Sequence, residues 1–119
     1  MKDRKEVLDF FSIDYIKNKI KNPIIKGKKE KHYFLYNGIY VSLRRAMIHE
    51  KIGYTCVNCG KVGKIYKLFK NNGYHLDLYC DDILMTIDHI IPKSKKGGNK
   101  ISNYQMMCCA CNEKKGAKL

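Results

Sequence analysis

The sequence is poor in acidic residues. It has 11 aspartates and glutamates against 24 lysines and arginines in 119 residues, and its formal net charge is +13. Charge repulsion of this size destabilises a compact fold unless an anion binds, which makes nucleic acid the leading partner. Arginine is also scarce, occurring only at positions 4, 44 and 45. Lysine is the less shape-specific phosphate ligand, so this composition favours contact with a nucleic-acid backbone over reading of bases.

Long apolar runs are missing as well. No window approaches the roughly 18 apolar residues of a membrane span, and the first residues lack the apolar core of a signal peptide. We therefore expect no membrane-spanning segment and a cytoplasmic location. Residues 15–31 and residues 93–119 each hold seven lysines and one acidic residue. No long hydrophobic face accompanies these lysines, so an acidic membrane surface ranks below nucleic acid as their partner.

The length suits one domain with a limited core. Residues 6–20 carry apolar side chains at three- and four-residue steps, which predicts an amphipathic helix ended by Pro23. Residues 32–41 and 65–79 each contain two β-prone runs separated by an asparagine-glycine turn, and they predict two hairpins. A further apolar strand is expected over residues 83–88.

Ser42 is suited to an N-cap, and a second helix is predicted after it, through about Lys51 and ended by Gly53. Arg44 and Arg45 lie in its first turns and are candidates for contact with phosphate. A solvated helix face accounts for them equally well.

Six cysteines include two Cys-x-x-Cys pairs with 48 residues between them: Cys56 with Cys59, and Cys108 with Cys111. Four thiolates from two such turns can close a tetrahedron around Zn²⁺, and a site with four sulfur ligands is structural because no position stays open for water. Disulfides, a redox pair or an iron site remain as alternatives, although a reducing compartment disfavours disulfides.

The other two cysteines, Cys80 and Cys109, are expected to be small buried hydrophobic residues. His32, His49 and His75 lack a partner motif, and we expect them to be structural or surface residues.

An aspartate and a histidine, Asp88 and His89, end an apolar run and precede a lysine-rich loop with two glycines. Thirteen positions separate His89 from Asn103, and eight separate Asn103 from Asn112, which directly follows the last paired cysteine. The order Asp-His, Pro, Ser, Gly-Gly, Asn-x-Gln, Cys-x-x-Cys-Asn-x-x-Lys-Gly resembles the HNH endonuclease family over about residues 54–117. The resemblance rests on residue identity, order and spacing together.

This resemblance implies an α+β fold: a small zinc-held ββα-metal domain, treble-clef-like, with an N-terminal extension of helix, β-hairpin and helix. Residues 54–119 would form the nuclease domain, with an insertion at about residues 61–83. Residues 1–53 would form the extension packed on that core. A strand ending at Asp88-His89, a second strand near residues 104–107 and a helix starting near Cys109 would make the ββα unit.

The resemblance also implies the site. Asp88 and Asn112 would bind one catalytic divalent ion, His89 would be the general base on water, and Asn103 would brace the loop. A carboxylate oxygen and an amide oxygen suit Mg²⁺ or Mn²⁺ better than the thiolates do. Neighbouring residues of a regular strand point to opposite sides, so Asp88 and His89 need a bend, or must act on different oxygens, to serve one phosphate.

The expected function is metal-dependent hydrolysis of DNA phosphodiester bonds, in the cytoplasm of a bacterial cell or a phage-infected host. A non-catalytic zinc module that binds nucleic acid is the alternative, but a carboxylate facing phosphate repels the ligand unless a cation lies between them. The sequence does not indicate the oligomeric state. The lysines best placed to hold DNA flank the motif: Lys93, Lys95, Lys96, Lys114 and Lys115.

Overall fold

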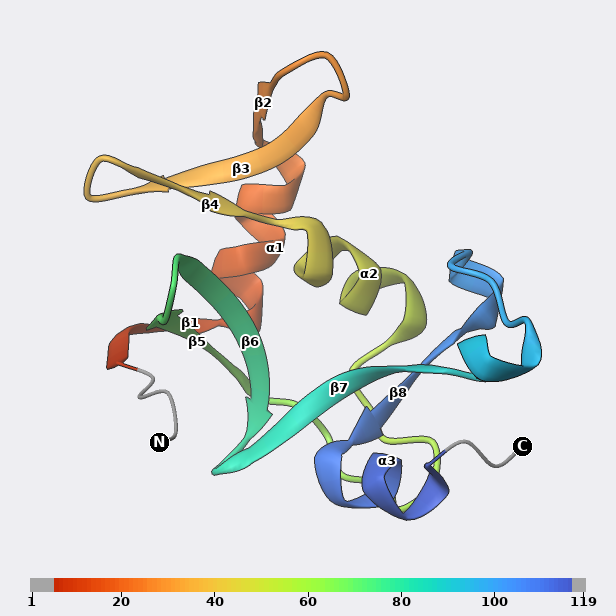
Figure 1. Ribbon diagram of the computed structural model, residues 1–119. Helices are drawn as coiled ribbons and strands as arrows, with labels where there is room; N and C mark the ends of the chain where they lie inside the picture. The colour runs from red at the N-terminus through yellow and green to blue at the C-terminus, as the bar shows by residue number, and fades with distance from the viewer. Residues whose placement is uncertain (1–5, 117–119) are drawn as a thin grey trace.

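Two antiparallel sheets organise residues 6–116, which the computed structural model describes (Figure 1). The larger sheet has the strand order β1-β5-β6-β7-β8, and the smaller has the order β2-β3-β4. The strands are β1 (Glu6–Ser12), β2 (Ile24–Lys26), β3 (Lys31–Tyr36), β4 (Ile39–Ser42), β5 (Ile65–Lys70), β6 (Tyr74–Cys80), β7 (Ile83–His89) and β8 (Tyr104–Cys108). The helices are α1 (Ile13–Lys21), α2 (Arg44–Ile52) and α3 (Cys109–Lys115), with short 3-10 turns at Lys93–Lys95 and Ile101–Asn103.

The predicted helix over residues 6–20 is wrong in its first half. Residues 6–12 form β1, which pairs with β5 at the edge of the larger sheet, and the helix begins at Ile13. The Ser12 hydroxyl caps it by accepting a hydrogen bond of 3.0 Å from the Tyr15 amide. Pairing with a strand more than 50 positions away overrides the helical spacing of the apolar residues.

Both predicted hairpins are confirmed. Asn37 and Gly38 join β3 to β4 with φ values of 45° and 80°, as a tight hairpin turn requires. The second turn, between β5 and β6, places Gly73 at φ 121°. The second helix ends at Ile52 with Gly53 as its C-cap, as predicted. Its N-cap is Leu43 and not Ser42, whose hydroxyl accepts from the Arg44 amide at 3.2 Å.

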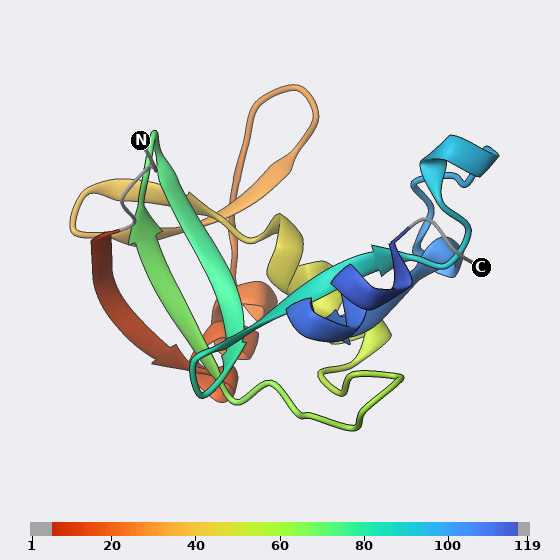
Figure 2. The ribbon, with the colours of Figure 1, turned by 60° about the horizontal axis from the view of Figure 1, so that its bottom comes forward.

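One hydrophobic core is built from both halves of the chain. Phe11, Ile16 and Leu43 belong to the same buried cluster as Tyr66 and Met106. The predicted insertion at 61–83 supplies β5 and β6, which link β1 to β7 within the larger sheet. Figure 2 shows α3 lying against β7 and β8, opposite the end of the molecule that carries β1. Within residues 6–116 no helix has the length and apolar character needed to cross a bilayer.

Candidate active site and cysteine cluster

Two tight turns present the paired cysteines. Cys56 and Cys59 lie in the loop after α2, where the Gly60 amide donates to the Cys56 carbonyl at 3.0 Å and Gly60 adopts φ 81°. Cys108 is the last residue of β8 and the N-cap of α3, so Cys111 falls in the first turn of that helix. The Val57 amide donates to the Met106 carbonyl at 2.9 Å, which ties the first turn to β8.

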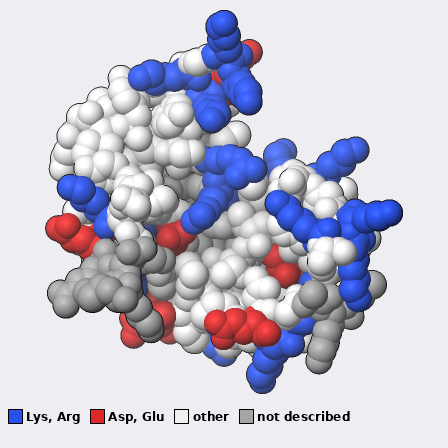
Figure 3. Space-filling view, viewed as in Figure 1, with Lys and Arg blue, Asp and Glu red and all other residues white. Residues whose placement is uncertain are grey.

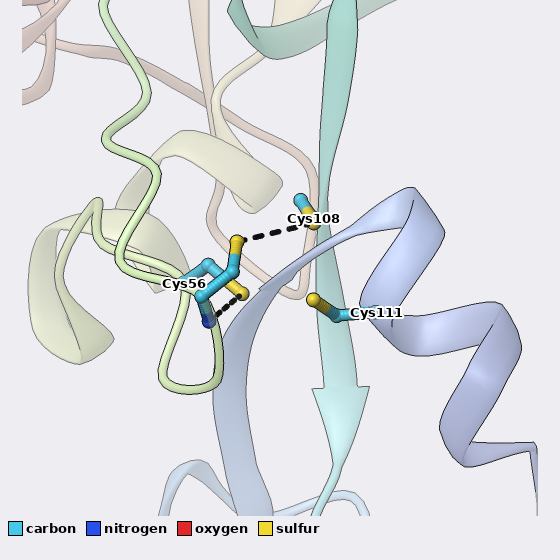
Figure 4. Close-up of side chains that lie close together, drawn as sticks. Cys56, Cys108 and Cys111 are labelled. Carbon is cyan, nitrogen blue, oxygen red and sulfur yellow. Dashed lines mark hydrogen bonds between the residues drawn. The ribbon is translucent and has the colours of Figure 1, made fainter.

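The four sulfur atoms form one cluster, with all ligand atoms within 4.8 Å of one another (Figure 4). Cys59 Sγ and Cys108 Sγ lie 3.7 Å apart. A tetrahedral Zn²⁺ with Zn–S bonds of about 2.3 Å would place its sulfurs about 3.8 Å apart. The residues present therefore fit a four-cysteine zinc site, and the predicted grouping of these cysteines is confirmed.

The electrostatics of the cluster also favour a cation. Burial raises the pKa of the Cys56 thiol, but hydrogen bonds from the backbone of Cys59, Cys108 and Asn58 outweigh it and lower that pKa to about 6. The Asn58 amide lowers the pKa of Cys111, yet the neighbouring Cys108 thiol, burial and the remaining cysteines raise it to about 11. The cysteines of the cluster therefore do not all favour the thiolate form on their own. A divalent ion would stabilise all the thiolates at once.

Replacing one cluster cysteine should lower zinc content and stability together. Cys56→Ser or Cys111→Ser removes a ligand from a site whose assembly is coupled to folding, so zinc should fall from about one per chain to well below half. Cys109→Ser is the matched control, since Cys109 is only half-buried and lies outside the cluster. Atomic absorption and thermal unfolding measure both effects. Equal zinc content in parent, control and cluster variants would refute the zinc site.

His49 is a structural residue, as predicted. It is buried on α2 with 2 % of its surface exposed, and its Nδ1 lies 2.8 Å from the Tyr66 hydroxyl. Burial and the nearby Arg45 guanidinium lower the pKa of His49 from 6.5 to about 4. His75 is half-buried and bonds through Nε2 to the Asn71 carbonyl at 2.9 Å.

The lowered pKa of His49 predicts acid sensitivity. Its folded pKa is about 4 and its unfolded pKa is near 6.5, so between these values the unfolded chain binds more protons and stability falls as the pH falls. The full loss, reached below about pH 4, should be on the order of 3 kcal/mol, and about 2 kcal/mol of it should appear between pH 7 and pH 5. Urea unfolding at about pH 7 and about pH 5 should show a smaller loss in His49→Gln than in the parent or in His75→Gln. An equal loss in all three proteins would contradict this role.

Asp88 lies near the end of β7, directly opposite Gln105 of β8. This register lets the Gln105 side-chain amide donate to Asp88 Oδ2 at 2.8 Å. From α3, Lys115 Nζ reaches the same carboxylate oxygen at 3.1 Å and the His89 carbonyl at 2.8 Å. Asp88 is only 6 % exposed, so the fold holds a nearly buried carboxylate whose partners are a cation and an amide.

Asn112 lies one helical turn before Lys115 and also faces β7. Its Nδ2 donates to Thr86 Oγ1 at 2.8 Å, and that hydroxyl donates to the Met107 carbonyl at 2.8 Å. Because the Thr86 hydrogen is used on Met107, its oxygen must accept from Asn112, which fixes the orientation of the Asn112 amide.

His89 is the last residue of β7 and is half-buried. Its ring packs edge-on against Tyr104, directly across the strand pair, with ring centroids 5.2 Å apart. Its Nε2 donates to Asn99 Oδ1 at 3.0 Å. Neither Asn99 nor Tyr104 was singled out from the sequence, although the antiparallel register of the two predicted strands brings Tyr104 to this place.

Asn103 holds the loop between β7 and β8. Its Oδ1 accepts from the Ile91 amide at 2.8 Å, and its Nδ2 donates to the Ile91 carbonyl at 3.1 Å and the Gly98 carbonyl at 2.8 Å. The loop is tight enough that a Cβ on Gly97 would lie 1.6 Å from the Ile91 carbonyl oxygen. Three hydrogen bonds from one side chain therefore connect both arms of this loop.

Asp88, His89 and Asn112 line one pocket of about 330 Å³, together with Lys93 and Lys115. We call it the catalytic pocket because it holds three residues that the sequence predicts to be catalytic. Asp88 and His89 therefore border the same pocket, although neighbouring residues of a regular strand point to opposite sides. Asn103 is not among the residues that line it. The remaining lining residues are Ile87, Pro92, Ser94 and Gly116.

The basic residues singled out from the sequence have different surroundings. Lys93, Lys95, Lys96 and Lys114 are exposed, whereas Lys115 is largely enclosed against Asp88. On α2 Arg44 is exposed, but the Arg45 guanidinium pairs with the buried Asp77 carboxylate of β6. No local motif predicts that pair, because its members lie 32 positions apart.

Comparison with protein families gives one match. The family model described as HNH endonuclease matches residues 56–118, which include the cysteine cluster, both strands beside the catalytic pocket and α3. No curated protein and no solved structure matches the chain.

Proposed function

The chain belongs to the HNH endonuclease family, and from this premise we propose that it is a divalent-ion-dependent endonuclease that hydrolyses phosphodiester bonds in DNA. The observation that carries the proposal is the shared pocket of Asp88, His89 and Asn112. The carboxylate and the amide can bind an ion, and the imidazole can act as a base. Basic side chains beside them suit phosphate.

Asp88 and Asn112 are the proposed ligands of a catalytic Mg²⁺ or Mn²⁺. Their donors are hard oxygens, which these ions prefer. The Asp88 carboxylate already takes the Lys115 ammonium group at 3.1 Å, so its surroundings suit a cation. Because Asn112 Nδ2 is held by Thr86, its Oδ1 is the atom that would meet an ion. When bound, a divalent ion polarises the phosphate and stabilises charge on the leaving oxygen.

His89 is the proposed general base. With Nε2 donating to Asn99, a neutral ring leaves Nδ1 able to accept a proton from water. The edge-on contact with Tyr104 limits rotation of the ring. Asn99 and Tyr104 are thus positioning residues for His89.

Asn103 is proposed to act on the loop rather than on the ion. Its three hydrogen bonds hold Ile91 and Gly98 together, and the Ile90 amide donates to its carbonyl at 2.8 Å. These contacts fix the chain immediately after His89. The proposed ββα-metal unit then consists of β7, this loop, β8 and α3, anchored by zinc at Cys108 and Cys111.

Lysine side chains beside the pocket are proposed to hold the DNA backbone. Lys93 lines the catalytic pocket, Lys95 and Lys96 follow in the same loop, and Lys114 is exposed on α3. Figure 3 shows lysine and arginine side chains gathered along this side of the molecule. Such contacts make affinity fall steeply with salt.

Incubation with supercoiled plasmid tests the proposed activity. We expect nicked or linear DNA with Mg²⁺ or Mn²⁺ and intact plasmid with a short EDTA treatment, with cleavage restored by excess Mg²⁺. The number of strands cut follows from the ratio of nicked to linear product. Plasmid that is retarded on a gel but never cut, under all these conditions, would identify a nucleic-acid-binding module instead.

A further inference from the structure

We propose that the chain binds an unpaired DNA strand next to its cleavage site, in a groove that the N-terminal residues build. This inference rests on the proposed nuclease function and extends it to a substrate class: duplex DNA with a single-stranded flank. The groove lies between β3, α2 and the residues that lead into β8, and it has a volume of about 590 Å³. We call it the side groove.

Shared lining residues link the side groove to the catalytic pocket. A smaller pocket of about 250 Å³ lies between them. It shares His89 and Lys93 with the catalytic pocket. Its other end shares Arg44, Asn99 and Tyr104 with the side groove. A strand whose phosphate is at His89 can therefore continue past Tyr104 into the side groove without leaving the surface.

The lining of the side groove combines cations with flat and aliphatic side chains. Lys29, Lys31, Arg44 and Lys51 surround it. Among the described residues, none that line the side groove or the connecting pocket is acidic. Figure 3 shows basic side chains on both sides of a notch in the surface. The apolar and aromatic lining consists of Tyr33, Met47, Ile48, Ile101 and Tyr104.

This combination selects an unpaired strand over a duplex. A duplex backbone needs cations but offers no apolar surface, because its bases are stacked inside the helix. Aromatic side chains between cations instead take the exposed faces of unpaired bases. Tyr33 and Tyr104 are the residues best suited to this contact, and Ile101 is 40 % exposed at the same groove. Lys29, Lys31 and Tyr33 all lie outside the residues that the family model matches.

Fluorescence anisotropy without added divalent ion tests the groove separately from cleavage. The probes are a blunt DNA duplex and duplexes with a 5′ or a 3′ single-stranded tail, all with the same total number of nucleotides. Stacking of one base should make the parent bind a tailed duplex at least about fivefold more tightly than the blunt duplex. Tyr33→Ala should remove that preference, and Tyr33→Phe should keep it.

Ile101→Glu is a second test, since it places a negative charge in the groove at an exposed position and should also remove the tail preference. Phe10→Ala is the matched control: Phe10 is 54 % exposed on β1, away from the groove. Equal affinity of the parent for blunt and tailed DNA would overturn the inference, as would a tail preference that survives both Tyr33→Ala and Ile101→Glu. A tail preference in a protein that cuts nothing would leave the groove assignment standing and refute only the nuclease function.

Discussion

His89→Ala should remove most of the cleavage while leaving the fold and DNA binding largely intact. A positioned general base typically contributes about 10²- to 10⁴-fold to the rate. The side chain is half-buried at the end of β7 and contacts Asn99 and Tyr104 rather than the main hydrophobic core, so its loss should cost little stability. Single-turnover cleavage rates, with zinc content and thermal unfolding measured on the same samples, give the comparison.

His75→Ala is the matched control for this variant. His75 is also half-buried and also bonds through Nε2, to the Asn71 carbonyl, but it lies on β6 and does not line the catalytic pocket. We expect it to cut at the parental rate. A His89→Ala protein that cuts as fast as His75→Ala would mean that the base is another group.

Asp88→Ala should nearly abolish cleavage, because it removes the only charged ligand proposed for the catalytic ion. DNA binding without divalent ion should instead hold steady or tighten, since a negative charge facing phosphate disappears. The structure strengthens this expectation: Lys115 is paired with Asp88 at 3.1 Å and would become available to phosphate. Weaker DNA binding by Asp88→Ala in the absence of divalent ion would contradict it.

Substitutions of Asn112 and Asn103 test ion binding and loop support separately. Asn112→Ala should weaken Mn²⁺ binding and lose most cleavage, because its Oδ1 is the second proposed ligand. Asn103→Ala should retain Mn²⁺ binding but unfold at a lower temperature, because it leaves three backbone groups of the loop without their partner. Normal Mn²⁺ binding in Asn112→Ala, with weakened binding in Asn103→Ala, would show that the roles are reversed.

Local signals in the sequence were enough to predict much of this site. Each Cys-x-x-Cys pair is a short turn, and α3 begins immediately after Cys108, so the cluster follows from two local motifs. The strand that ends at His89 and the strand at residues 104–108 were also predicted near their observed places. The two hairpins were also predicted from local signals, because each turn has a glycine, Gly38 or Gly73, that can adopt the positive φ the turn needs.

The features that the sequence did not give depend on distant parts of the chain. Residues 6–12 form a strand only because β5 is there to pair with them. The contact of Lys115 with Asp88 needs α3 to pack on β7, and the Arg45–Asp77 pair needs α2 to pack on β6. The side groove needs the β2-β3-β4 sheet to stand beside the loop before β8. Periodicity and motif spacing contain no information about such packing.

The most direct test of the proposed nuclease is a single-turnover time course on supercoiled plasmid in Mg²⁺, with the parent, His89→Ala and Asp88→Ala proteins purified and assayed side by side. The proposed mechanism predicts that the parent leaves 5′-phosphate and 3′-hydroxyl ends, so DNA ligase should reseal its nicks. It also predicts that both variants cut more slowly by roughly 10²-fold or more. Equal cleavage by all three proteins, or no cleavage by a zinc-loaded parent, would contradict it.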